Sequence, residues 1–121
     1  MKRDFDVIRK LLFYFEQKET PELVKVPSVE GYDDMMIKYH LVLLYDAGFL
    51  RCEPMRSSTS DRVICVSPFE LTWAGHEFLE KIRSDGVWNR IQGDIRSEGG
   101  VMAFSVIERI ATNFALEVFD T

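Results

Sequence analysis

This sequence is poor in cysteine, proline, long apolar runs and positive charge, and each shortage excludes a class of protein. It holds two cysteines and four prolines in 121 residues, which excludes a disulfide-stapled scaffold and a proline-rich disordered chain. No apolar run approaches the roughly 20 residues that a membrane-spanning helix needs. Positive charge is also scarce, because 15 lysines and arginines face 20 acidic residues for a formal net charge of −5. Such an acidic total argues against a non-specific binder of polyanions, which is normally basic overall.

What the sequence does have is enough apolar material for one core. Hydrophobic residues make up 46% of the chain, with nine phenylalanines and two tryptophans, and the length fits a single domain. The basic start followed by apolar residues resembles a signal peptide only superficially, because charged residues interrupt the apolar region and no small-residue cleavage site follows. We expect a soluble cytoplasmic protein with free thiols and no membrane partner.

Apolar residues at three- and four-residue steps predict two amphipathic helices in the first half of the chain. The first runs from about Asp4 to Lys18, with acidic side chains in its first turn, where they complement the helix dipole. The second has Asp33 as its N-cap, runs to Ala47 and ends on Gly48 as a C′ glycine.

The segments around the second helix predict strands. Leu23, Val24 and Val26 favour a brief edge strand that Pro27 stops. After the second helix, FLRCEPMR and DRVICVS flank the polar turn SSTS, which is typical of a β-hairpin.

The position of this turn sets the pairing of the hairpin. With the turn centred on Ser58 and Thr59, Cys52 falls directly opposite Cys65. Pro54 cannot donate to a ladder, which favours an edge or a bulge in the first strand.

Three further helices are expected in the second half of the chain. Thr72 caps the first of them. Its predicted apolar face consists of Trp73, Phe78, Leu79 and Ile82. Ser84-Asp85-Gly86 ends this helix and starts the next one, and Gly99-Gly100 precedes the last. The last helix is apolar on more than one face, so it lies in the core or forms an oligomer interface.

The order helix, short strand, helix, β-hairpin wing and helix is that of the winged-helix plan. We therefore predict an α+β, winged-helix-like single domain over residues 1–121. Residues 84–121 form its two-helix C-terminal extension, which packs on the core or dimerises. A fold alone offers only an analogy for function.

Three blocks carry a resemblance to a known family: MKRDFDVIRKLL, GYDDMMIKYHLVLLYDAGFL and LTWAGHEFLEKIRSDGVWN. In order they resemble a bacterial family of small proteins with a domain of unknown function, often encoded in phages and prophages. The resemblance covers nearly the whole chain. It implies a winged-helix-like fold and supplies no established activity for any residue.

Positive charge is concentrated in two segments, which makes duplex DNA a candidate partner. Residues 1–12 carry four basic and two acidic side chains, and residues 51–67 carry three and two. The helix after Asp33 would be the recognition helix, yet one lysine beside Asp33 and Asp34 reads phosphate or guanine poorly. The candidate DNA-binding residues are Lys2, Arg3, Arg9, Lys10, Lys38, Arg51, Arg56 and Arg62. Ordinary solvated charges are the commoner explanation of such residues.

The alternative function is a protein-interaction module without nucleic-acid contact. It would be a phage or prophage accessory protein that binds a host factor, or a homodimer through the last helix. The candidate interface residues are Met35, Tyr39, Val42, Tyr45, Phe104, Ile107, Phe114 and Phe119. Tyr39, Val42 and Tyr45 are equally consistent with packing under the C-terminal helices.

No catalytic constellation is found, so we predict a regulatory protein that is not an enzyme, with no catalytic residues, metal or cofactor. His40 and His76 lack partners at zinc-site spacing, and we expect His40 to hydrogen-bond between elements. Cys52 and Cys65 could bind metal or oxidise as a cross-strand pair, but reduced sheet cysteines are favoured. Two tryptophans could form a ligand slot, although core positions are commoner.

Overall fold

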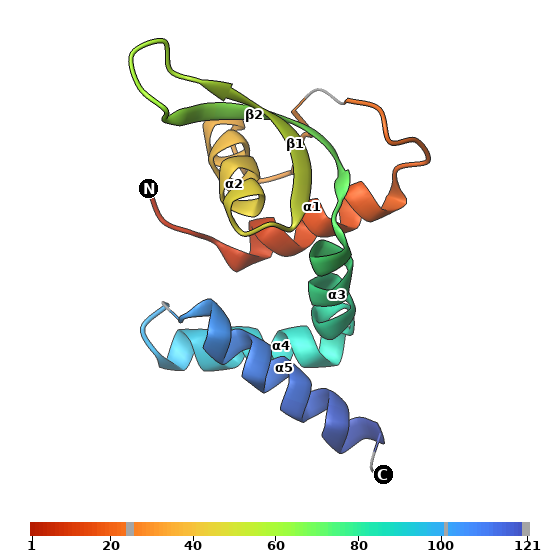
Figure 1. The fold of residues 1–121 in the computed structure, drawn as a ribbon. Helices are drawn as coiled ribbons and strands as arrows, with labels where there is room; N and C mark the ends of the chain where they lie inside the picture. The colour runs from red at the N-terminus through yellow and green to blue at the C-terminus, as the bar shows by residue number, and fades with distance from the viewer. Residues whose placement is uncertain (24–25, 101, 120–121) are drawn as a thin grey trace. The chain divides into compact units, whose positions relative to one another are not determined.

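A computed structural model describes residues 1–23, 26–100 and 102–119, without the side chains of residues 115 and 117–119. The described residues form five α-helices and a two-stranded antiparallel hairpin, so the fold is mixed α+β (Figure 1). The chain divides into two compact units, unit 1 from Met1 to His76 and unit 2 from Glu77 to Thr121. The predicted extension from residue 84 begins within unit 2, and the single-domain organisation stays a prediction.

Helix α1 (Phe5–Gln17) is one residue shorter at each end than the predicted span, because Asp4 and Lys18 are its caps. The Asp4 side chain accepts a hydrogen bond from the backbone N–H of Asp6 at 2.9 Å, which satisfies one of the free amides of the first turn. Lys18 is the C-cap, with extended backbone. Its buried face consists of Val7, Ile8, Leu11, Leu12 and Phe15.

Helix α2 (Asp34–Asp46) confirms both of its predicted ends. Asp33 is the N-cap and accepts from the backbone N–H of Met36 at 2.9 Å. Gly48 follows the C-cap with φ of +79°, a conformation that costs glycine little because it has no Cβ. The buried residues of this helix are Ile37, His40, Leu41 and Leu44.

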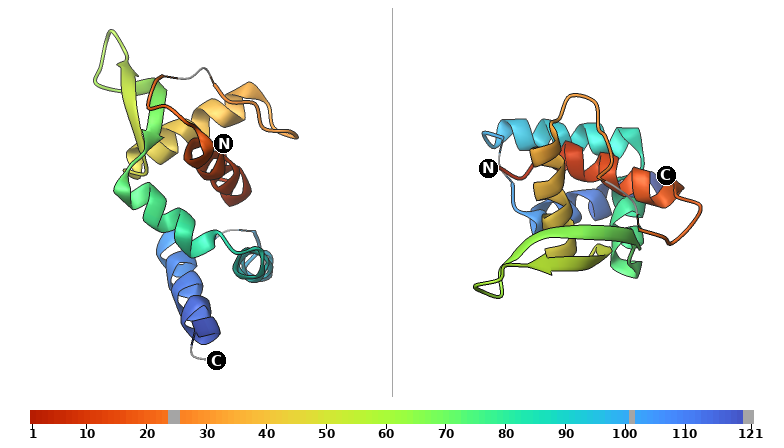
Figure 2. Two further views of the ribbon diagram at one scale, coloured as in Figure 1. Left: turned by 90° about the vertical axis from the view of Figure 1, so that its right-hand side faces the viewer. Right: turned by 90° about the horizontal axis from the view of Figure 1, so that it is seen from above.

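The hairpin consists of β1 (Leu50–Arg56) and β2 (Val63–Leu71). Leu50 pairs with Leu71, and both are buried on the face of the hairpin that packs against α2. Helix α1 contacts both α2 and β2, so the core of unit 1 lies between the two helices and the inner face of the hairpin (Figures 1 and 2).

The predicted pairing of Cys52 with Cys65 is wrong. Cys52 lies opposite Pro68, and Cys65 lies opposite Met55. The loop is longer than a four-residue polar turn, since residues 57–62 all lie between the strands. Two register shifts, after Arg51 and after Met55, add further residues to β2. A symmetric hairpin around the centre of SSTS contains neither feature.

Helix α3 (Trp73–Ile82) starts at the predicted cap. The Thr72 hydroxyl accepts from the backbone N–H of Gly75 at 3.1 Å and donates to the carbonyl oxygen of Gly48. The Thr72 amide donates to the Phe49 carbonyl oxygen at 3.0 Å. One threonine thus joins the start of α3 to the turn between α2 and β1.

The predicted apolar face of α3 is wrong at one end. Phe78, Leu79 and Ile82 are buried as expected, but Trp73 is 80% exposed. It occupies the first helical position, directly after Thr72, where the helix has just begun. Helical periodicity alone therefore assigns it to the wrong environment.

Unit 2 adds α4 (Asp85–Ser97) and α5 (Phe104–Phe119) to the end of α3. The Ser84 hydroxyl caps α4 by accepting from the Val87 amide at 3.4 Å. Gly99 and Gly100 follow α4 with φ of +80° and +87°, which allows the chain to reverse. Within the unit α4 contacts α5. Helix α3 contacts α5 through the rings of Phe78 and Phe104, 4.8 Å apart, and through an ion pair between Lys81 and Glu108 at 3.3 Å.

The brief strand expected between α1 and α2 is absent from the described residues there. Leu23 is half-exposed and, like Val26, lies in irregular backbone, while Val24 lies outside the described residues. The element order of the described chain is therefore helix, helix, hairpin and three helices.

Candidate nucleic-acid interface

The tip of the hairpin is an ordered loop that carries hydroxyl groups between two arginines. The Ser57 amide donates to the Arg62 carbonyl oxygen at 2.8 Å and closes the loop. Inside it, the Ser57 hydroxyl accepts from the Thr59 amide at 3.2 Å, and the Ser60 hydroxyl accepts from the Arg62 amide at 3.3 Å. These side-chain-to-backbone bonds fix the loop where it lies beyond the core.

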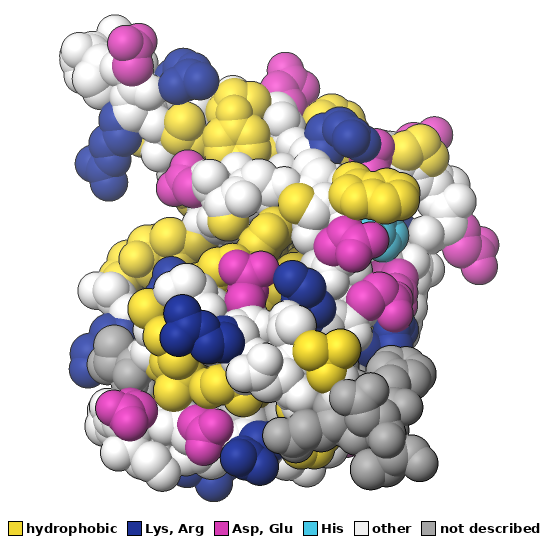
Figure 3. Space-filling model, turned by 60° about the horizontal axis from the view of Figure 1, so that its bottom comes forward, with side chains coloured by type: hydrophobic (Ala, Val, Ile, Leu, Met, Phe, Trp, Pro, Cys, Tyr) yellow, Lys and Arg dark blue, Asp and Glu magenta, His cyan; other side chains and the backbone are white. Residues whose placement is uncertain are grey.

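Arg56 and Arg62 stand on either side of this loop, and both are exposed. Arg56 donates to the carbonyl oxygen of Asp61 at 2.9 Å, which leaves its charge uncompensated. Neither arginine makes an ion pair with any residue that the structure describes. In Figure 3 the tip, at the upper left, presents basic side chains and one acidic side chain.

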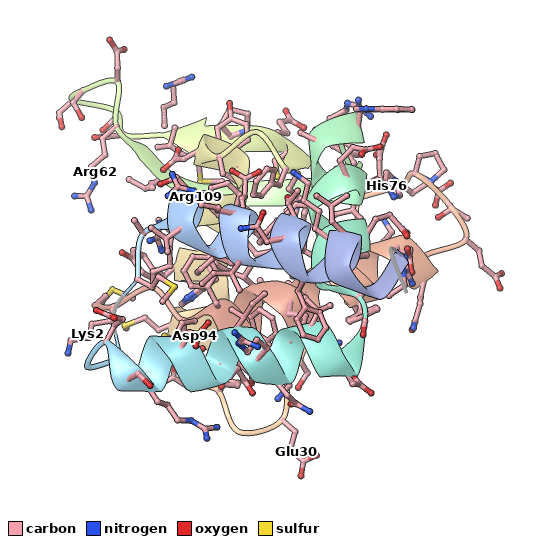
Figure 4. All side chains as sticks on the ribbon, turned by 90° about the horizontal axis from the view of Figure 1, so that it is seen from below. Lys2, Glu30, Arg62, His76, Asp94 and Arg109 are labelled. Atoms are coloured by element: carbon pink, nitrogen blue, oxygen red, sulfur yellow. The ribbon has the colours of Figure 1, made fainter. Side chains whose placement is uncertain are left out.

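The N-terminal segment points to the same side of unit 1 as the hairpin tip. Lys2 and Arg62 both project to the left in Figure 4, and Figure 1 draws the N-terminus and the tip on that side. Lys2 and Arg3 are exposed, and the Arg3 guanidinium lies over the Phe5 ring at 4.7 Å. The backbone of this segment is fixed at Asp4, whose amide donates to Nε2 of buried His40 at 2.8 Å.

Three other candidate DNA-binding residues are engaged inside the chain. Lys10 pairs with Asp6 at 2.9 Å, and Arg51 pairs with Glu70 at 2.8 Å. The Arg9 guanidinium lies over the Phe13 ring at 4.9 Å, on the half-buried side of α1. These contacts compensate or cover charge that DNA would otherwise meet.

Helix α2 offers an acidic end where a recognition helix would present its N-terminus. Asp33 and Asp34 are both exposed there, whereas Lys38 follows a turn later. Lys38 is exposed and makes no ion pair within the described chain. Lys2 and Arg62 thus project to one side of unit 1 (Figure 4), whereas α2 is a weak partner for phosphate.

The candidate protein-interface residues fall into several environments. Met35 is 69% exposed, while Tyr39, Val42 and Tyr45 are half-buried on α2. In unit 2, Phe104 and Phe114 are half-buried. Ile107 is fully buried, so it cannot contact a partner in this conformation. The Phe119 side chain lies outside the described residues.

Sequence reasoning missed three of the most exposed apolar side chains. Trp73, Met55 and Ile64 are 80%, 56% and 53% exposed. Ile64 is the additional residue of a register shift, since Val63 and Cys65 pair with consecutive residues of β1. A bulge redirects a side chain in a way that strand alternation does not reveal.

The structure offers no assembled metal site among the residues it describes, where no three His, Cys, Asp or Glu side chains gather. Both cysteines are free thiols, half-buried, and burial raises the pKa of Cys52 to about 12. Both ring nitrogens of His40 are occupied by backbone hydrogen bonds, as expected for a histidine that joins two elements. The predictions of no metal, no cofactor and no catalysis remain predictions.

Comparison with known proteins identifies a family and a relative of this chain, but it indicates no activity. A sequence model of the DUF2513 family, described as a hypothetical protein, matches residues 2–101. An uncharacterised protein of Haemophilus influenzae is 34% identical over 112 residues, which cover 92% of each chain. No solved structure matches the chain significantly. Among the described helices, none is long and apolar enough to cross a membrane.

Proposed function

This chain belongs to the DUF2513 family of hypothetical proteins, and from the geometry of unit 1 we propose that it is a small non-enzymatic regulatory protein that binds duplex DNA. The order α1, α2, β1 and β2 supports a winged-helix-like arrangement, in which α2 takes the place of the recognition helix and the hairpin that of the wing. The proposed setting is the cytoplasm of a bacterium, with a phage or prophage origin.

The observation that carries this proposal is the pair of arginines at the hairpin tip. Arg56 and Arg62 are exposed, flank a hydroxyl-rich loop and have no carboxylate partner among the described residues. Arginine and hydroxyl groups are common donors to phosphate oxygens. Lys2 projects to the same side (Figure 4), so the tip and the N-terminal segment can reach one DNA backbone together.

The acidic start of α2 sets the mode of binding that we propose. Asp33 and Asp34 would lie close to phosphate if α2 entered the major groove end-on, and the repulsion would oppose insertion. Contacts through the wing and the N-terminal segment avoid this repulsion. Binding of this kind rests on the DNA backbone and discriminates sequence weakly.

A salt titration of DNA affinity tests the proposal. Fluorescence anisotropy with a labelled duplex should show affinity that falls steeply with salt, and Arg56→Ala/Arg62→Ala should reduce the slope of log K against log salt by about 2. The matched control, Arg96→Ala/Arg109→Ala, removes the same charge from exposed positions of unit 2 and should leave the slope unchanged. Absence of binding at low salt, or equal losses in both variants, would overturn the proposal.

A protein-interaction function is the second candidate, and exposed Trp73 favours it. An indole that is 80% exposed is unusual, and tryptophan is enriched among residues that dominate binding energy. A pull-down from nuclease-treated bacterial lysate should then recover a partner with the wild type and lose it with Trp73→Ala. A partner retained equally by both proteins would contradict this surface.

A further inference from the structure

Unit 2 contains a groove of about 520 Å³ between the C-terminal end of α4 and the first turns of α5. One side is apolar and is formed by Met102, Ala103, Val106 and Ile110. The other side is polar and comes from Asp94, Ser97 and Glu98. The groove therefore offers apolar contact area with carboxylates along one border.

The polar border carries two carboxylates at the C-terminal end of α4, whose last turn also holds the exposed Arg96. Asp94 lies in the last turn of α4 and Glu98 is its C-cap, where the carbonyl ends of the helix already carry partial negative charge. Arg90 compensates Asp94 only loosely, at 3.7 Å. Glu98 is exposed and makes no ion pair with the residues that the structure describes. A complementary occupant needs apolar side chains flanked by positive charge.

The hairpin tip of this same protein has that chemistry. Met55 and Ile64 are exposed apolar side chains close to the loop. Arg56 directly follows Met55, and Arg62 precedes Ile64 by two residues. The bulge at Ile64 keeps this side chain out of the core of unit 1. Two exposed apolar side chains near the base of the loop, with an arginine at each end of the loop itself, match an apolar groove with two carboxylates.

We propose that the groove of one copy binds the hairpin tip of a second copy. Met55 and Ile64 cover the apolar side, while Arg56 and Arg62 approach Asp94 and Glu98. The contact is heterologous, since two different surfaces meet, and it is weak, because a hairpin tip covers less area than a standard interface of roughly 800 Å² per partner. This self-association goes beyond DNA binding and does not rest on it.

Complementary charge reversal tests the contact. Wild type should associate as its concentration rises from micromolar to millimolar in sedimentation velocity. Asp94→Lys/Glu98→Lys and Arg56→Glu/Arg62→Glu should each lower the association constant by about tenfold or more. An equimolar mixture of the two should recover it, because each variant then meets the opposite charge. The matched control, Glu30→Lys/Asp34→Lys, reverses two exposed acids of unit 1 and should associate as wild type does.

Several results would overturn the proposal. One is a monodisperse monomer at millimolar concentration. Another is association that the groove substitutions leave unchanged, and a third is an equimolar mixture of the two charge-reversal variants that does not recover association. Asp94→Asn/Glu98→Gln separates this proposal from DNA binding. It should lose self-association and retain the DNA affinity of the wild type, so failure of one proposal leaves the other measurable.

Discussion

The Nε2 atom of His40 accepts a hydrogen bond from the backbone N–H of Asp4 at 2.8 Å, and Nδ1 of the same ring lies 2.8 Å from the carbonyl oxygen of Met36. A ring nitrogen that faces a carbonyl carries the proton, so the imidazole is neutral with its hydrogen on Nδ1. His40 is fully buried. It therefore ties α2 to the N-cap residue of α1.

Replacing His40 with phenylalanine should destabilise the protein by about 1–3 kcal/mol. The aromatic ring is retained, but the Asp4 amide loses its acceptor in a part-buried position. Urea unfolding followed by circular dichroism measures the change. His76→Phe is the matched control, because His76 is exposed, and it should alter stability by no more than about 0.5 kcal/mol. Equal effects would show that the hydrogen bond contributes nothing.

Gly75→Ala should cost about 3 kcal/mol or prevent folding. A Cβ at Gly75 would lie 2.1 Å from the Phe49 carbonyl oxygen, and that oxygen cannot retreat freely because it accepts the Thr72 amide at 3.0 Å. Gly93→Ala is the control within α4, where nothing lies within 4 Å, and it should stabilise by about 0.5–1 kcal/mol. Thermal unfolding compares the two, and a Gly75→Ala protein as stable as wild type would disprove the close contact.

The phenol of Tyr32 should ionise at a higher pH than an ordinary tyrosine. Burial, then its hydrogen bond to Asp6 at 3.0 Å and the charges of Asp4 and Asp6, raise the pKa of Tyr32 from 10.0 to about 12. Because the folded-state pKa is raised, the associated stability is complete below pH 10 and is lost as the pH rises through about 12. In an ultraviolet titration of tyrosine ionisation, Tyr32→Phe should remove the component that titrates at the highest pH. Asp6→Asn should lower the pKa of Tyr32. Loss of a component that titrates normally in Tyr32→Phe would contradict this.

Cys52 should resist alkylation in the folded protein, because burial raises its pKa to about 12 and little thiolate forms near neutral pH. The variants Cys52→Ser and Cys65→Ser isolate each thiol for rate measurement with iodoacetamide. The protein that retains only Cys52 should react slowly until urea unfolds it. Mild oxidation should also give no internal disulfide, because Cys52 lies opposite Pro68 and not opposite Cys65. An oxidised monomer with shifted mobility on a gel would contradict the register.

The helix ends were predictable because local chemistry decides them. Four helices begin with a side chain that accepts a hydrogen bond from a backbone N–H of the first turn: Asp4, Asp33, Thr72 and Ser84. A side chain of this type is visible in the sequence. Gly48 likewise has the positive φ expected after a helix. Helix ends can therefore be predicted from four or five neighbouring residues, because distant contacts do not change them.

The pairing of the hairpin and the placement of Trp73 were not predictable in this way. Hairpin register depends on two bulges that no short motif marks, and a single extra residue moves every later pair. Trp73 has the helical spacing of a core residue, yet its exposure depends on what the rest of the chain covers. The basic residues of the candidate site could be read from the sequence. Their ion pairs, Lys10 with Asp6 and Arg51 with Glu70, are known only from the three-dimensional structure.

The bulge at Ile64 makes the hairpin sensitive to length at one position and tolerant at another. Residues inserted within the loop 57–62 would lengthen the tip while leaving both strands in phase. Deleting Ile64 would instead remove the bulge, bring Val63 directly next to Cys65 and restore strict alternation at this end of β2. Insertions and deletions in related sequences should therefore accumulate in the loop, whereas the residue count from Val63 to Leu71 should stay constant.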